Sequence, residues 1–251
     1  MPKALGLICL TLLGICFGSF TNVLIFRLPR NEEFVKTPSH CLSCGHRLSW
    51  YENIPILSFL VQKGRCRSCG VRLSLQYPLV EALTGLMWLL TGLLLWGNWI
   101  PMGLYCLLFP LLEAVTVIDW RTFEIPNGLS AAIAVLGLVR LLTDLGRWPL
   151  YLIGALSVSL LFLLLWFLTG GKGLGLGDVK LMAAAGLLLG WPKTILSMLI
   201  GSVAGVIIHL IRMRHGAGNK LAFGPYLSAG IWVSALLGDA IIGAYLGLFG
   251  L

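Results

Sequence analysis

Charged residues are scarce in this chain, at 11% of 251 residues against about 25% in soluble domains. This scarcity excludes a soluble globular enzyme and a disordered chain, because both depend on a charged, hydrated surface. Strict apolar–polar alternation is also missing, which argues against an outer-membrane barrel. The net charge is +8, but no basic stripe is interleaved with aromatic residues, so we expect no nucleic-acid partner.

What the chain has instead is apolar sequence: 58% of its residues are hydrophobic, 31 are Gly, and the mean hydropathy is +0.92. Only helices and closed barrels satisfy their backbone groups within lipid. The composition therefore predicts an all-α, polytopic protein that spans a lipid bilayer. The first apolar run, Leu5–Phe26, is too long for a cleavable signal sequence and lacks a cleavage site. We interpret it as a retained first span.

A membrane-spanning helix needs about 20 apolar residues. On that criterion we predict about eight spans, of which the sixth is short. They are Leu5–Phe26, Tyr77–Trp96, Ile100–Ile118, Gly128–Leu142, Pro149–Thr169, Leu181–Gly190, Ile195–Ile211 and Tyr226–Phe249. A polar block, Arg27–Gln76, separates the first two.

The distribution of Lys and Arg predicts the orientation, because cytoplasmic loops retain basic residues. One side of the membrane receives 14 of them, from Arg27–Gln76, Asp119–Asn127, Gly170–Lys180 and Arg212–Lys220. The other side receives only 4. We therefore expect the polar block and the glycine-rich loop to face the cytoplasm and both termini to lie outside.

The polar block contains two CxxC pairs, Cys41 with Cys44 and Cys66 with Cys69, separated by 21 residues. This spacing is typical of a four-thiolate zinc site. A Gly follows each pair and suits a tight turn that directs both sulfurs to one metal. Disulfides fit a reducing cytoplasm less well, and an iron–sulfur cluster remains an alternative. Four thiolates leave no open coordination position, so the predicted zinc is structural and helps a small domain to fold.

Two of the four Asp residues lie at the predicted cytoplasmic membrane boundary. Asp119 ends the third span, and Asp178 follows the glycines Gly175 and Gly177 near the start of the sixth. Acids at membrane depth indicate function, although each could also be a helix-end residue that reaches water. Together they predict a carboxylate dyad that shares a proton and activates water.

The glycines beside Asp178 leave a surface without side chains. Gly175 and Gly177 would let another helix, or an extended substrate backbone, come close to the acid. The segment is not a phosphate-binding P-loop, because no GK[ST] follows the glycines.

Taken together, these motifs resemble the type IV prepilin peptidases, which belong to the GxGD class of intramembrane aspartyl proteases. The resemblance rests on several motifs in order along the chain. They are Gly18-Ser-Phe-Thr-Asn-Val-Leu-Ile-Phe-Arg-Leu-Pro29, the paired CxxC motifs, Glu52-Asn-Ile-Pro55, Gly64-Arg-Cys66, Tyr77-Pro-Leu-Val-Glu81, Asp119 with Ile125-Pro-Asn127, Gly175-Leu-Gly-Asp-Val-Lys-Leu-Met182 and Phe223-Gly-Pro-Tyr226.

The resemblance implies a bifunctional enzyme of the bacterial inner membrane. Asp119 and Asp178 would cut the basic leader from a prepilin or pseudopilin at the cytoplasmic face, and the new N-terminus would be methylated from S-adenosylmethionine. The four cysteines would bind the zinc of the longer, methylating members. Glu52 and the Arg27–Arg30 segment are candidates for the methylation site only by position, and solvated charges are the simpler interpretation.

The resulting organisation has three parts: a first transmembrane helix in residues 1–26, a cytoplasmic zinc-binding domain in 27–76, and a membrane-embedded protease domain in 77–251. Two other classes of protein remain open. A proton-coupled transporter could use the Asp pair, although no second GxGD-like segment marks an internal repeat. A non-catalytic zinc-binding adaptor would explain the cysteines but not the two acids. The sequence leaves the oligomeric state open.

Overall fold

The computed structural model describes residues 2–34, 36–215, 221–248 and 250. The predicted limit Phe249 and the end of the loop Arg212–Lys220 fall outside these residues. Helices dominate, and the β-structure in the described ranges is confined to two isolated bridges, His40 with Arg47 and Arg65 with Arg72. The all-α prediction is therefore confirmed.

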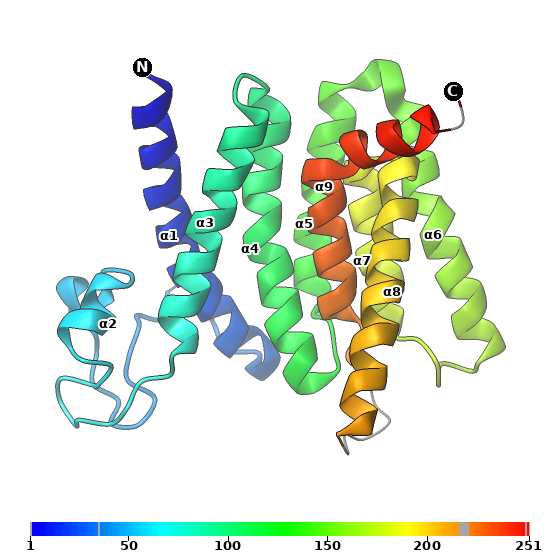
Figure 1. Cartoon of the computed structure of the whole chain (residues 1–251). Coiled ribbons are helices and arrows are strands. Elements are labelled where there is room, and N and C mark those ends of the chain that lie inside the picture. Colours follow the sequence, from blue (N-terminus) through cyan, green and yellow to red (C-terminus); the bar gives the residue numbers. More distant parts are fainter. Residues whose placement is uncertain (1, 35, 216–220, 249, 251) are drawn as a thin grey trace. The chain divides into compact units, whose positions relative to one another are not determined.

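The α-helices follow the predicted apolar runs closely (Figure 1). Their bounds are α1 Lys3–Arg27, α2 Leu57–Val61, α3 Gln76–Leu95, α4 Trp99–Thr122, α5 Asn127–Thr143, α6 Trp148–Leu168, α7 Leu176–Leu189, α8 Trp191–Arg214 and α9 Gly224–Gly247. Short 3-10 turns lie at Leu28–Arg30, Trp50–Asn53 and Leu145–Arg147.

Six helices of the described chain are long and apolar enough to cross a membrane. They contain α1, α3, α4, α6, α8 and α9. The fourth and sixth predicted spans correspond to α5, of 17 residues, and α7, of 14. Both are short for an upright crossing, which needs about 20 residues. A multi-pass membrane protein is thus confirmed, whereas the count of eight stays a prediction.

The chain divides into two compact units, Met1–Met102 and Gly103–Leu251, so that the division falls within α4. In the first unit, α1 packs along α3. Gly18 makes this close approach possible, because a Cβ there would lie 2.7 Å from the Cα of Glu81 on α3. The polar block between these helices carries the short helix α2.

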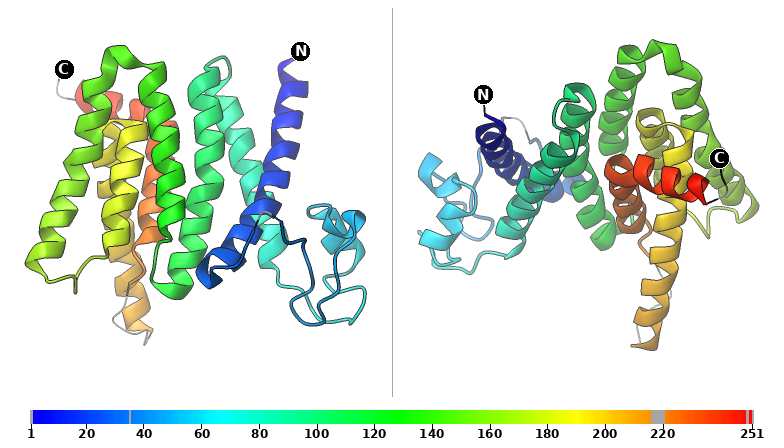
Figure 2. Two further views of the ribbon diagram at one scale, coloured as in Figure 1. Left: turned by 180° about the vertical axis from the view of Figure 1, so that it is seen from behind. Right: turned by 45° about the horizontal axis from the view of Figure 1, so that its top comes forward.

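In the second unit, α7 contacts α5, α6, α8 and α9, and Figure 2 shows it enclosed among them. Its residues Leu181, Met182 and Ala185 are fully buried. This burial explains how a helix of 14 residues fits into a membrane protein: its neighbours, rather than lipid, surround it. Its N-terminal turn carries Asp178 to the end of the unit where α4 ends and α9 begins.

Candidate functional site

Asp119 and Asp178 come together at one pocket of the second unit. The pocket has a volume of about 250 Å³ and is lined by Asp119, Phe123, Glu124, Ile125, Asn127, Gly175, Leu176, Gly177 and Asp178. The two acids are 5% and 8% exposed, so neither reaches freely into solvent. Both acids are helix-end residues, but their burial contradicts the interpretation that each reaches water.

Each carboxylate accepts one backbone hydrogen bond. The Asp119 Oδ2 atom accepts the Gly224 N–H at 2.8 Å, and the Asp178 Oδ2 atom accepts the Gly175 N–H at 3.2 Å. Neither acid forms an ion pair within the described ranges. The amine of the nearby Lys180 instead donates to Asn127 Oδ1 at 2.9 Å. Two buried carboxylates that line one pocket without a basic partner disfavour a state in which both are ionised.

Helix ends place the two acids. Asp119 lies in the last turn of α4, and Asp178 is the third residue of α7, where its carboxylate caps the helix by accepting the amide of Gly175. Gly177 packs tightly, since a Cβ there would lie 3.0 Å from the Cβ of Ile125. Gly175 and Gly177 both line the pocket, and Gly177 also brings α7 close to the segment that follows α4.

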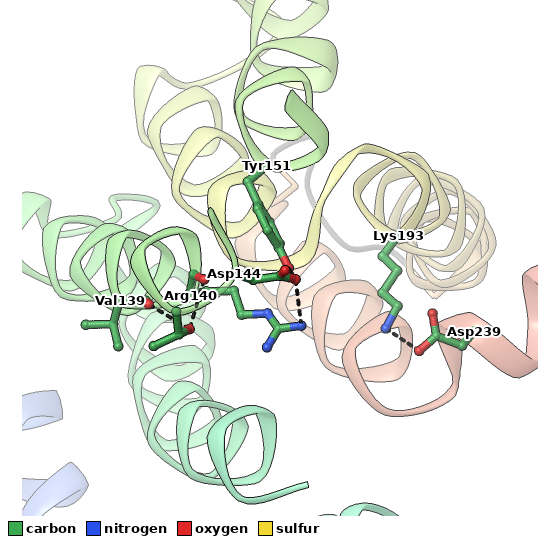
Figure 3. A network of polar contacts seen from close by, with 7 residues as sticks. Val139, Arg140, Asp144, Tyr151, Lys193 and Asp239 are labelled. Carbon is green, nitrogen blue, oxygen red and sulfur yellow. Dashed lines mark hydrogen bonds and ion pairs between the residues drawn. The ribbon is translucent and has the colours of Figure 1, made fainter. Parts of the chain in front are cut away.

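The other two Asp residues differ, because both pair with basic side chains at the opposite end of the unit. Figure 3 shows Arg140 and Tyr151 beside Asp144, and Lys193 pointing to Asp239. The Tyr151 hydroxyl donates to Asp144 at 2.7 Å, while Arg140 lies 3.7 Å from the same oxygen. Lys193 and Asp239 are 2.7 Å apart. Asp144 and Asp239 therefore have basic partners, whereas Asp119 and Asp178 have none among the described residues.

Gly224 and Asn127 are pocket partners that sequence reasoning did not assign. Both belong to segments, Phe223-Gly-Pro-Tyr226 and Ile125-Pro-Asn127, that carried the family resemblance. A Cβ at Gly224 would lie 2.8 Å from the Asp119 Oδ2 atom, so any larger residue there would displace the carboxylate. The motif Phe223-Gly-Pro-Tyr226 could have marked Gly224 as a candidate. The sequence did not show that Gly224 contacts Asp119.

The four predicted metal ligands lie together in the first unit. The sulfur atoms of Cys41, Cys44, Cys66 and Cys69 are all within 4.8 Å of one another, and Cys41 and Cys69 are 4.0 Å apart. Four thiolates around a tetrahedral zinc are separated by about 3.8 Å, given a zinc–sulfur distance of about 2.3 Å. The residues present therefore fit a zinc ion, and the predicted clustering is confirmed.

The two CxxC loops have the same backbone hydrogen bonds. In each, the Gly amide donates to the first Cys carbonyl at 2.9 Å, and Gly45 and Gly70 have φ angles of +73° and +71°. The predicted glycine turns are confirmed. The backbone N–H groups of Cys44 and Ser43 lower the pKa of Cys41 to about 7, whereas burial and the neighbouring thiols outweigh the Val71 N–H and raise the pKa of Cys69 to about 11.

A second, larger pocket lies in the first unit, with a volume of about 920 Å³. Its walls come from α1, the polar block and α3. Glu52 lines this pocket and is buried, so the simpler interpretation of Glu52 as a solvated charge is wrong. Arg27 has a structural role, because its guanidinium donates to the carbonyls of Glu33, Thr37 and Pro38.

Family models match both units. The bacterial peptidase A24 N-terminal domain matches residues 12–95, and the type IV leader peptidase family matches residues 106–210. The two matches thus fall one on each compact unit. No solved structure is found to match the chain.

Curated relatives match over nearly the full length. A protein of Pseudomonas putida is 32% identical, covering 100% of this chain and 97% of its own length. One from Aeromonas salmonicida is 36% identical, with 94% and 92% covered, and one from Pseudomonas aeruginosa is 35% identical, with 95% and 93% covered. All three are named prepilin leader peptidase/N-methyltransferase.

Proposed function

The chain belongs to the type IV leader peptidase family, and from this premise we propose that it cleaves the leader of type IV prepilins or pseudopilins and then methylates the new N-terminus. The family match and the names of the relatives support both reactions. They support neither a transporter nor a non-catalytic zinc-binding adaptor.

One observation carries the proteolytic step: Asp119 and Asp178 line the same pocket, both buried and both without a basic partner in the described chain. We assign them as the catalytic pair. One carboxylate removes a proton from the attacking water, while the protonated partner donates to the carbonyl oxygen of the scissile peptide bond. When the tetrahedral intermediate collapses, a proton passes to the leaving nitrogen.

The glycines of the pocket suit the substrate. Gly175 presents backbone without a side chain beside Asp178, whereas the side of Gly177 that a Cβ would occupy packs against Ile125. An extended peptide can therefore approach the acid closely. The family resemblance implies cleavage just after a Gly, and a narrow substrate backbone fits such a surface.

Zinc and S-adenosylmethionine are the proposed cofactors. Cys41, Cys44, Cys66 and Cys69 would hold a structural zinc, since four thiolates leave no position for substrate or water. S-adenosylmethionine would supply an electrophilic methyl group attached to a sulfonium. The large pocket of the first unit has the volume of a cofactor site, which spans about 300–1,000 Å³.

We also propose the membrane arrangement predicted above. The chain crosses the bacterial inner membrane with about eight helices, including the short α5 and α7, and has both termini outside. Residues 1–26 form the first span, 27–76 the cytoplasmic zinc domain and 77–251 the protease domain. The excess of Lys and Arg in the loops around the Asp pocket supports a cytoplasmic active site.

A paired assay tests the proposal. Purified chain in detergent is mixed with a prepilin and S-adenosylmethionine, and the product mass is followed over time. We expect a product that lacks the leader and carries one added methyl group. A wild-type chain that leaves the prepilin intact would contradict the proposed peptidase.

A further inference from the structure

The large pocket of the first unit has room for a small molecule and shares no lining residue with the Asp pocket. Its volume of about 920 Å³ lies near the upper end of the range for small-molecule sites. All of its lining residues lie between Cys16 and Glu81, so it belongs wholly to the first unit. It is therefore distinct from the pocket of Asp119 and Asp178.

Glu52 is the polar side chain of this pocket with an unused oxygen. Its Oε2 atom accepts the Ser49 N–H at 2.9 Å and contacts His46 Nε2 at 3.2 Å. Its Oε1 atom is buried and has no hydrogen-bond partner among the described residues, and the side chain is only 2% exposed. A buried acceptor without a partner is costly, so such an atom calls for a ligand that donates to it.

The charge of Glu52 defines the chemistry of that ligand. The amide of Ser49 lowers the pKa of Glu52, so the group is a carboxylate at neutral pH. The other two carboxylates that line the pocket are engaged: Glu81 accepts the Ile56 N–H at 2.7 Å, and Glu32 lies 3.9 Å from Arg30. A fixed anion with a free oxygen selects a small cationic donor such as an ammonium group.

Aromatic rings supply the apolar part of the pocket. Phe26 and Tyr77 stack with ring centroids 5.3 Å apart, and Phe20 and Phe34 meet edge to face at 6.5 Å. All four residues line the pocket. Aromatic faces bind a flat heterocycle and attract a cationic centre, and the methyl donor of the proposed function has both.

We propose that this pocket is the methylation site and that the Glu52 Oε1 atom binds the α-ammonium group of the newly cut pilin N-terminus. The inference rests on the proposed function, because only that function supplies the ammonium group and the methyl donor. It adds the place of the second reaction and the residue that recognises its substrate.

The reaction balances with the groups named. The α-ammonium, held by the Glu52 carboxylate, gives one proton to water and becomes a neutral amine. The amine nitrogen then forms a bond to the methyl carbon as the carbon–sulfur bond breaks, and that bonding pair stays on sulfur. The products are a secondary ammonium and S-adenosylhomocysteine, and Glu52 stays a carboxylate throughout.

A binding experiment tests the role of Glu52 without relying on turnover. The full chain in detergent is titrated with a fluorescent peptide of the mature pilin N-terminus, in the presence of S-adenosylhomocysteine. The same peptide with an acetylated N-terminus is the control ligand. We expect Glu52→Gln to raise the Kd of the free-amine peptide at least tenfold and to leave the acetylated peptide unchanged.

The Gln variant is a fair test because Gln can replace Glu in the capping box that Ser49 and Glu52 form. Glu33→Gln is the matched control, since Glu33 is an exposed carboxylate whose side chain accepts the Lys36 N–H and lies outside the pocket lining. A bound zinc per chain in both variants confirms that the domain is folded. Equal Kd values for wild type and Glu52→Gln would overturn the proposal.

A second pair of variants tests the pocket itself. Val23 on α1 lines it, whereas Leu12 on the same helix is 58% exposed. We expect Val23→Trp to weaken S-adenosylhomocysteine binding at least tenfold, as measured by calorimetry, and Leu12→Trp to leave it within twofold. Unchanged affinity in Val23→Trp would also overturn the inference.

The experiments distinguish a failure of the proposed function from a failure of the proposed methylation pocket. If the wild-type chain cleaves but adds no methyl group, the second proposed reaction is wrong. If it methylates while Glu52→Gln and Val23→Trp still bind and methylate as wild type, only the assignment of this pocket is wrong. Loss of peptide binding in Glu52→Gln with cleavage intact supports the inference.

Discussion

Asp119, at the end of α4, accepts a hydrogen bond of 2.8 Å from the backbone amide of Gly224, which lies 105 residues later at the start of α9. This contact joins the first catalytic candidate to the last helix of the unit. It holds one oxygen of the carboxylate in a defined direction. The geometry of the pocket therefore depends on a segment far from either acid in sequence.

The first prediction concerns the acids. Asp119→Asn and Asp178→Asn should each lower the rate of prepilin cleavage by at least about 100-fold, since general acid–base catalysis contributes roughly 10²–10⁴-fold. An amide can neither take a proton from water nor share one with its partner. The rate is measured by loss of the prepilin band under single-turnover conditions.

Asp239→Asn is the matched control for this pair. Asp239 is also an acid of the second unit, but its side chain is 87% exposed and pairs with Lys193 at the opposite end. We expect the control to cleave within twofold of wild type. Two active-site variants that still cut at the wild-type rate would exclude the proposed dyad.

The second prediction concerns the glycine beside Asp119. A Cβ at Gly224 would lie 2.8 Å from the Asp119 Oδ2 atom, so Gly224→Ala must displace the carboxylate. A shift of about 1 Å can cost about 100-fold in rate. We expect kcat to fall between about 10-fold and 100-fold, with little change in KM.

Gly243→Ala provides the comparison on the same helix, because a Cβ there meets nothing within 4 Å. It should cleave like wild type. If both alanine variants keep full activity, the Gly224 contact does not position Asp119.

The sequence predicted the helices well but placed several of their ends wrongly. The sixth span was expected at Leu181–Gly190, whereas α7 begins at Leu176. Hydropathy detects the apolar part of a helix and treats Asp178 and Lys180 as loop. In the structure both are helical, because Asp178 caps the first turn and Lys180 donates to Asn127.

Short sequence motifs predicted the candidate site residues, but they could not predict contacts between segments that are distant in the sequence. The CxxCG repeats predict their own turns, since each turn closes within five residues. The burial of Glu52 depends instead on how a 3-10 turn, Trp50–Asn53, packs within the unit. The role of Gly224 likewise depends on the packing of helices that are distant in sequence.

The third prediction compares the Tyr151–Asp144 hydrogen bond with the Lys193–Asp239 ion pair, both drawn in Figure 3. Tyr151 is 2% exposed, and its hydroxyl donates to Asp144 at 2.7 Å. Tyr151→Phe should lower the free energy of unfolding by about 1.5–3 kcal/mol, because a hydrogen bond to a charged group is lost. The exposed Lys193–Asp239 pair should contribute less than about 1 kcal/mol. Unfolding in SDS measures both, and a larger loss in Asp239→Asn would reverse this ranking.

The fourth prediction concerns the metal. The purified chain should contain one zinc, and Cys66→Ser should lose it, because Cys66 is a buried member of the sulfur cluster. Without the metal the small domain loses most of its folding free energy. Methylation should therefore fall at least 100-fold. Cleavage should fall less than tenfold, since every residue of the Asp pocket lies in the second unit.

Cys9→Ser is the control for the metal prediction, since Cys9 lies exposed on α1 outside the cluster. It should keep its zinc and both activities. Metal content by mass spectrometry, cleavage and methyl incorporation are measured on the same preparation. Equal loss of cleavage and methylation in Cys66→Ser would mean that the zinc domain supports the protease as well. We expect unequal losses instead, because the two pockets lie in two units and each reaction then depends on the fold of its own unit.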